Sequence, residues 1–175
     1  VDIIARNQAN VDGIKISLLS AEKEIAMRRQ LPDGVRMYTG DDFNYPQLIA
    51  GDERGFSHAL LGIFAAIAPA ASAALKALHE EKLDLYYEIL NPTLPLARHM
   101  FCAPTRFYKT GVVFLAYLNG HQDHFLMLGG QQSARSAIHL AELLRLADSA
   151  GVLLDPELAC HRAALVLSTM GVEQA

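Results

Sequence analysis

The sequence has little of several features that define common classes of protein. It contains no tryptophan, and charged residues make up only 19% of the chain. No apolar run approaches the roughly 20 uninterrupted residues that a membrane-spanning helix needs. The longest candidate, residues 59–71, is too short and is broken by Gly62 and Pro69. We therefore expect a protein without a membrane span.

Cysteine is also scarce, and positive charge is not in excess. Cys102 and Cys160 lie far apart without the spacing of metal ligands, so we expect two reduced thiols in helices and neither a metal nor a cofactor. The formal net charge of −4 argues against a surface that binds nucleic acid. No secretory signal is visible, and we expect a cytoplasmic protein.

What is present is an alternation of strands and helices, followed by helices alone. Hydrophobic residues make up 51% of the 175 residues, which is enough for one core-forming domain. Short apolar runs separated by helices predict parallel βα units. The predicted strands are residues 11–17, 35–39 and 57–61, and the predicted helices are residues 21–30, 44–50, 69–79, 83–90, 94–102, 104–118 and 133–150, with a last helix capped by Asp155.

Three short strands do not make a stable domain, because their sheet would keep an unpaired edge. The chain starts at Val1 rather than at a methionine, and residues 1–10 have the pattern of a helix that is ending. We therefore expect a fragment or a processed piece, whose sheet is completed by upstream chain or by another subunit.

The first predicted strand has two different faces. Ile14 and Ile16 fall on an aliphatic face, whereas Gly13, Lys15 and Ser17 place one amine between small residues. A lysine in a cramped, poorly hydrated place loses affinity for its proton and can then attack a carbonyl carbon. The alternative is a lysine at the end of a strand that extends its ammonium group to solvent.

Three short motifs fall at the expected carboxyl ends of the strands. They are Gly13-Ile14-Lys15, then Gly40-Asp41-Asp42, and then an apolar strand that ends at Leu61-Gly62, shortly before Ala68-Pro69. In this order and spacing, the chain from about Asp12 to Leu153 resembles the dihydrodipicolinate synthase / N-acetylneuraminate lyase family of class I aldolases.

The resemblance implies an α/β fold, the C-terminal part of a (β/α)8 TIM barrel. Residues 1–68 would supply strands six to eight, and residues 69–175 would supply the closing barrel helix and a helical extension. It implies that Lys15 forms a Schiff base with a 2-oxo acid or a sugar-derived carbonyl, and that Gly40, Leu61 and Gly62 line the pocket.

The resemblance also implies partners and leaves gaps. We expect a small-molecule substrate, the N-terminal half of the barrel in the same or a separate chain, and a homo-oligomer, but no nucleic acid and no membrane. The family's tyrosine proton shuttle and its Thr-Thr-Gly turn belong to earlier strands, and no residue here stands in for them. The fragment alone is therefore expected to be inactive, and the alternative function is a non-catalytic barrel remnant that serves in binding or oligomerisation.

Other candidate residues have ordinary explanations beside functional ones. The acids Asp41 and Asp42 are either an acid–base pair, or one helix cap and one salt-bridged or solvated acid. Tyr38 reaches the pocket only if its strand parity directs it inward. The remaining candidates are His121, Asp123 and His124, as metal ligands or as a surface loop, and Arg28, Arg29 and Arg135, as exposed helix charges.

Overall fold

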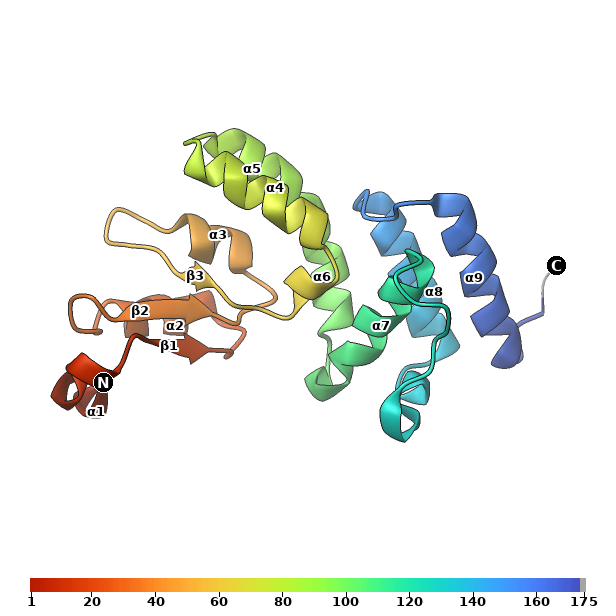
Figure 1. Cartoon of the computed structure of the whole chain (residues 1–175), viewed down its shortest axis with the longest axis horizontal. Helices are drawn as coiled ribbons and strands as arrows, with labels where there is room; N and C mark the ends of the chain where they lie inside the picture. The colour runs from red at the N-terminus through yellow and green to blue at the C-terminus, as the bar shows by residue number, and fades with distance from the viewer. Residues whose placement is uncertain (174–175) are drawn as a thin grey trace. The chain divides into compact units, whose positions relative to one another are not determined.

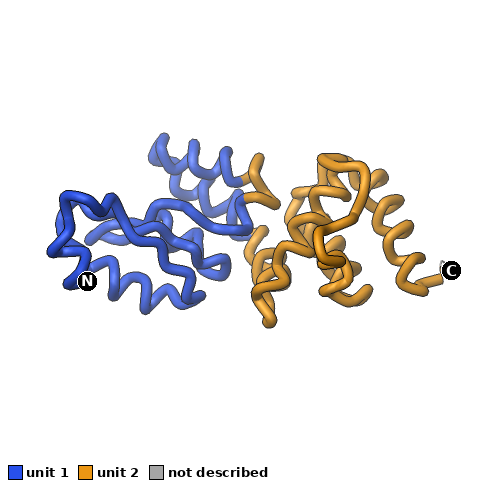
Figure 2. The backbone as a smooth tube through the Cα atoms, turned by 60° about the horizontal axis from the view of Figure 1, so that its bottom comes forward, with its two compact units in different colours: residues 1–64, 71–91 blue, residues 65–70, 92–175 orange. Residues whose placement is uncertain are grey.

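The computed structural model describes residues 1–173 and shows a mixed α/β chain. The chain divides into two compact units (Figure 2). Unit 1 comprises residues 1–64 and 71–91, and unit 2 comprises residues 65–70 and the chain from residue 92 onward.

A three-stranded parallel sheet organises unit 1 (Figure 1). Its strands stand in the order β1, β2, β3, so the predicted parallel arrangement is confirmed, although each strand is shorter than the predicted run. The elements are α1 (Asp2–Arg6), η1 (Gln8–Asn10), β1 (Gly13–Ile16), α2 (Ala21–Arg28), β2 (Arg36–Thr39), α3 (Tyr45–Ala50), β3 (His58–Ala59), η2 (Ile63–Ala65), α4 (Ala68–His79) and α5 (Leu83–Leu90).

The two faces of this sheet differ sharply in burial. Ile16, Met37 and Thr39 are buried on one face, where Glu24 of α2 contacts Thr39. On the other face Lys15 is exposed, and in the strand register it lies opposite Tyr38. The helices α2 and α3 thus cover one face of the sheet, and the face with the amine is the uncovered one.

Local signals in the sequence explain where the helices of unit 1 begin and end. Ser20 caps α2, because its hydroxyl accepts a hydrogen bond from the backbone N–H of Lys23. Pro46 stands in the first turn of α3, and Gly51 ends this helix with a φ of 80°. The hydroxyl of Tyr86 in α5 is buried and donates to the carbonyl of Pro46 at 2.8 Å, which joins α5 to α3.

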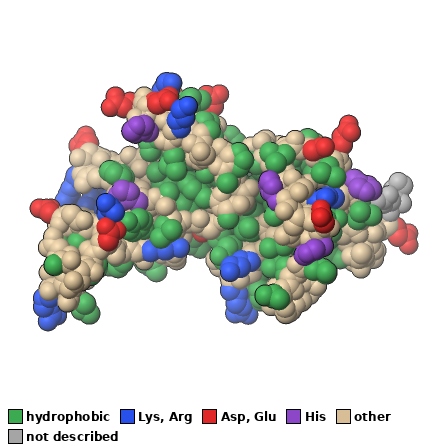
Figure 3. Space-filling model, viewed as in Figure 1, with side chains coloured by type: hydrophobic (Ala, Val, Ile, Leu, Met, Phe, Trp, Pro, Cys, Tyr) green, Lys and Arg blue, Asp and Glu red, His purple; other side chains and the backbone are tan. Residues whose placement is uncertain are grey.

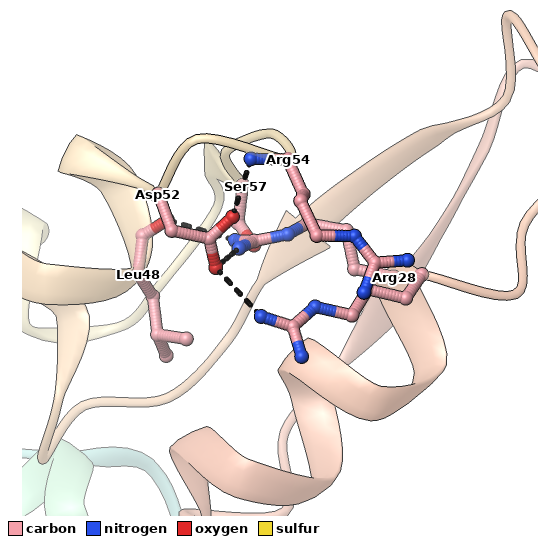
Figure 4. Close-up of polar contacts among 6 residues, drawn as sticks. Arg28, Leu48, Asp52, Arg54 and Ser57 are labelled. Carbon is pink, nitrogen blue, oxygen red and sulfur yellow. Dashed lines mark hydrogen bonds and ion pairs between the residues drawn. The ribbon is translucent and has the colours of Figure 1, made fainter.

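Arg28 is not the exposed helix charge that the sequence predicts. Its side chain is only 8% exposed, and its guanidinium donates to Asp52 Oδ2 at 2.8 Å (Figure 4). The same guanidinium donates to the Ser57 hydroxyl and to the Leu48 carbonyl. Arg28 therefore ties the end of α2 to the segment that leads into β3, at the amino-terminal edge of the sheet. Arg29 is 41% exposed and makes a longer contact with Asp52.

Unit 2 is helical. Its largest fully buried side chains include Phe114, Leu118 and Leu140, which form the centre of the bundle. The elements are η3 (Asn91–Thr93), α6 (Leu94–Met100), η4 (Thr105–Phe107), α7 (Tyr108–Leu118), η5 (Leu128–Ser133), α8 (Ala137–Ser149) and α9 (Pro156–Thr169).

The start of α8 differs from the prediction. The helix begins at Ala137 with Ser136 as its cap, not at Ser133, because Ser133 belongs to a 3₁₀ turn. Arg135, predicted to point to solvent, is 8% exposed. Its guanidinium donates to the carbonyl oxygens of Cys102, Ala103 and Pro104, so the charge is satisfied by backbone acceptors.

Both cysteines are free thiols, as predicted. Cys160 lies in α9, but Cys102 lies just after the end of α6 rather than in a helix. Within residues 1–173, no helix has the length and apolar character that crossing a bilayer requires.

A stacked pair of histidines in unit 2 predicts that stability falls in mild acid. The rings of His99 and His139 lie 4.0 Å apart, and His99 Nε2 contacts the carbonyl of His139. Burial, with added repulsion from His99 and Arg135, lowers the pKa of His139 to about 4. Because the pKa of His139 in the folded protein lies below the usual 6.5, its contribution to stability is complete above pH 6.5. This contribution is lost as the pH falls toward 4.

Partial exposure limits the size of this effect. We expect the free energy of unfolding to fall by about 1–2 kcal/mol between pH 7 and pH 4.5 through His139. Urea unfolding of the wild type and of His139→Gln at both pH values measures it. An equal pH dependence in the two proteins would contradict the prediction.

Candidate functional site

The carboxyl ends of the three strands meet at one edge of the sheet in unit 1. Gly40 follows β2, and its N–H donates to the carbonyl of Ile16 at the end of β1. The N–H of Leu60 in turn donates to the carbonyl of Thr39 at 3.1 Å. Lys15 is the next-to-last residue of β1, and Gly40 and the Leu61-Gly62 segment follow β2 and β3, so all of them lie near this edge.

The side chain of Lys15 lies against the backbone of Gly40. A Cβ built on Gly40 would lie 2.6 Å from Lys15 Cε, 2.9 Å from the Ile16 carbonyl, and closer still to the Ser17 hydroxyl. Real Cβ atoms do not approach other atoms so closely, so this position requires glycine. The alkyl chain of Lys15 passes over Gly40, and Lys15 itself is exposed to solvent.

The acids Asp41 and Asp42 have different roles. Asp41 Oδ1 accepts hydrogen bonds from the N–H groups of Phe43 and Asn44, at 2.8 and 2.9 Å, which caps the turn before α3. Asp42 is neither solvated nor a simple surface ion pair, because it is only 5% exposed and its Oδ1 accepts from the N–H of Ile63 at 2.7 Å.

The environment of Asp42 makes it hold a proton more strongly than an ordinary aspartate. Burial raises its pKa to about 6, while the N–H of Ile63 and the positive charge of Lys15 oppose this rise. The Gly-Asp-Asp motif thus supplies a turn that is fixed by Asp41 and a titratable carboxylate, Asp42, in the electric field of the lysine.

Glu24 of α2 is linked to the Gly-Asp-Asp turn through the hydroxyl of Thr39, and the sequence does not predict this role. The Thr39 hydroxyl donates to Glu24 Oε2 at 2.9 Å and accepts from the N–H of Asp41 at 3.1 Å. Glu24 is 1% exposed, and burial raises its pKa. Glu24 stands in the first turn of α2 beside Glu22, and nothing in the sequence distinguishes it from a solvent-facing acid at the start of a helix.

Tyr38 lies on the lysine face, which settles the parity that the sequence left open. It stands opposite Lys15 in the register, and its ring is 5.5 Å from that of His58. Its hydroxyl, however, donates to Asp12 Oδ2 at 2.7 Å, and Asp12 also pairs with Arg36. The hydroxyl of Tyr38 is thus held at the amino-terminal edge, away from Gly40.

The loop with His121, Asp123 and His124 shows no metal-binding arrangement. No group of three or more suitable side chains is present among residues 1–173. His124 Nδ1 accepts a hydrogen bond from the N–H of Leu126 at 3.2 Å, and the Asp123 side chain is fully exposed. His124 Nδ1 is thus engaged in a hydrogen bond within its own loop.

Unit 2 contains a small cavity and an exposed apolar groove. The cavity, of about 110 Å³, is lined mainly by apolar residues such as Ile67 and Leu115. Two polar side chains, Asn119 and His121, also line it, and Asn119 binds the backbone of Val152 and Leu154. Large apolar side chains such as Leu126 are exposed near the groove, and Figure 3 shows hydrophobic side chains at the surface of the viewed face.

A protein-family model covers almost the whole chain. The family model described as "Protein of unknown function (DUF993)" matches residues 1–172. No curated protein matches the chain. Because the family model covers nearly all of the sequence, the chain belongs to the DUF993 family.

Proposed function

We propose that this chain carries the reactive lysine of a Schiff-base-forming lyase or aldolase that acts on a 2-oxo acid or a related carbonyl compound. The observation that carries the proposal is the position of Lys15. It stands at the carboxyl end of a strand, with its alkyl chain over Gly40 and with Asp42 nearby. These are the positions at which parallel α/β enzymes place catalytic groups.

The chemistry follows from the amine. The free amine of Lys15 attacks the carbonyl carbon, and loss of water from the carbinolamine leaves an iminium ion. The iminium withdraws electrons from the adjacent carbon, so a C–C bond there can be formed or broken through an enamine. In this proposal Gly40, Leu61 and Gly62 line the pocket. Gly40 lets the alkyl chain of Lys15 lie against its backbone, and Leu61 and Gly62 follow the third strand at the same edge of the sheet.

The proposed architecture is the last part of a (β/α)8 barrel, with β1 to β3 as strands six to eight. The uncovered face of the sheet supports it, because parallel sheets are normally buried on both faces. On this face and at its edge, Lys15, Phe56 and Leu60 are exposed, the latter two by 55% and 51%. The other barrel strands, in the same or a separate chain, would cover these residues, and the helical unit would serve the proposed homo-oligomer.

Reductive trapping tests the proposed function. The full-length protein is incubated with pyruvate and sodium borohydride, and its peptides are analysed by mass spectrometry. We expect a reduced adduct on the peptide that contains Lys15, because borohydride converts the iminium into a stable secondary amine. Lys15→Arg should lose the adduct, since a guanidinium does not form an iminium under these conditions.

Lys76 provides an internal control for nonspecific labelling, because its side chain is 77% exposed and lies outside the site. Labelling of Lys76 to the same extent as Lys15, or the absence of any adduct with pyruvate and other 2-oxo acids, would refute the proposal. The latter result would instead favour a non-catalytic barrel that serves in binding or oligomerisation.

A further inference from the structure

Asp42 is a buried carboxylate that carbonyl capture, as described above, does not use. It is 5% exposed, whereas Asp12 and Asp52, which make ion pairs elsewhere in unit 1, have side chains that are 65% and 33% exposed. A buried carboxylate is costly unless its surroundings compensate for the lost water. Asp42 has three such compensations, the backbone N–H groups of Ile63 and Gly62 and the charge of Lys15.

Asp42 belongs to the turn that contacts the lysine side chain. Gly40, two residues before it, contacts the Lys15 side chain, and the N–H of Ile63 holds its Oδ1 at 2.7 Å. Asp41, the nearest other acid, uses its carboxylate to cap the turn before α3. Of the two acids of this turn, Asp42 is therefore the one that does not cap α3, and it lies near enough to Lys15 for the ammonium charge to favour its ionised form.

We propose that Asp42 is the proton carrier for Lys15, taking a proton from its ammonium group and returning it to the oxygen that leaves the substrate. This inference rests on the proposed function. The ammonium gives one proton to Asp42, and the free amine then forms the C–N bond with the carbonyl carbon. A second proton passes from nitrogen to oxygen, and Asp42 returns the first proton as the C–O bond breaks. The products are the iminium ion, water and the Asp42 carboxylate.

The charges around Asp42 suit this role. A proton carrier works best when its pKa lies near the working pH, so that it can both accept and release a proton. Burial brings the pKa of Asp42 to about 6, while Lys15 lowers it and Asp41 raises it. Below pH 6 Asp42 is increasingly protonated and cannot accept the proton, so carbonyl capture should slow on the acid side.

The first test measures the coupling without any substrate. Carboxyl-carbon NMR follows the titration of Asp42 in the wild type and in Lys15→Met. We expect a midpoint near 6 in the wild type and a higher one in the variant, because the variant lacks the ammonium that favours the ionised carboxylate. An unchanged midpoint would overturn the inference, and this test leaves Asp42 itself unaltered.

The second test measures the rate of capture at Lys15 by quenching with borohydride at timed intervals between pH 5 and pH 8. Asp42→Asn keeps an acceptor for the N–H of Ile63 and should slow capture by about a hundredfold, with loss of the inflection near pH 6. The exposed Asp33→Asn is the control. Wild-type rates in Asp42→Asn would overturn this inference alone, whereas absence of any adduct in the wild type would overturn the proposed function.

Discussion

Replacing Gly40 by alanine is expected to abolish carbonyl capture at Lys15 and to lower the free energy of unfolding by about 1–3 kcal/mol. The new Cβ would lie 2.6 Å from Lys15 Cε and 2.9 Å from the carbonyl of Ile16. The lysine chain can swing away, but the Ile16 carbonyl cannot, because it accepts the N–H of Gly40 within the sheet. The amine therefore leaves its position while the strand is strained.

Borohydride trapping and urea unfolding measure the two effects. A double variant, Ser17→Ala with Gly40→Ala, is the matched control, because the new methyl group also meets the Ser17 hydroxyl. Removal of that hydroxyl should recover part of the stability but not the capture, since the clash with Lys15 remains. Full capture in Gly40→Ala would show that the reactivity of Lys15 does not depend on its contact with Gly40.

The sequence predicts the skeleton of the site because its signals are local. Alternation of apolar residues locates β1, and the glycine at Gly51 and the proline at Pro46 locate α3. Parallel order follows from the helices between the strands. With the strands in order, Lys15 and Gly40 necessarily come to the same edge.

The sequence does not predict which charges are buried, because burial depends on contacts between distant segments. Arg28 meets Asp52, which is 24 residues away, and Arg135 meets carbonyl oxygens more than 30 residues away. Glu24 of α2 accepts a hydrogen bond from the hydroxyl of Thr39 in β2, 15 residues further along the chain. Periodicity assigns the two arginines to exposed faces of predicted helices, and it gives no sign that Glu24 is buried.

The same limit explains the two acids of the Gly-Asp-Asp motif. Their adjacency in sequence suggests a pair, yet Asp41 caps its own turn while Asp42 binds the N–H of Ile63. Their roles differ because Ile63, in the segment after β3, donates to Asp42. No local pattern in the sequence predicts where that segment lies. The raised pKa of Asp42 is therefore a property of the folded unit.

Replacing Arg28 by alanine is expected to lower the free energy of unfolding by about 3 kcal/mol, because it removes a largely buried cation from three acceptors at once. Arg28 donates to Asp52, to the Ser57 hydroxyl and to the Leu48 carbonyl (Figure 4). Ser57 immediately precedes β3, which has only two residues, His58–Ala59, and few ladder hydrogen bonds of its own. The edge strand therefore depends on this contact more than a longer strand would.

Arg29→Ala is the matched control, because Arg29 approaches the same carboxylate oxygen at 3.4 Å but is 41% exposed. Surface pairs of this kind contribute less than about 1 kcal/mol. Urea unfolding should thus separate the two neighbouring arginines, and Arg28→Lys should lie between them, since it keeps the charge but loses the forked geometry. Equal losses for Arg28→Ala and Arg29→Ala would mean that β3 is held by its other contacts, such as the bond from the Ser57 N–H to the Leu48 carbonyl.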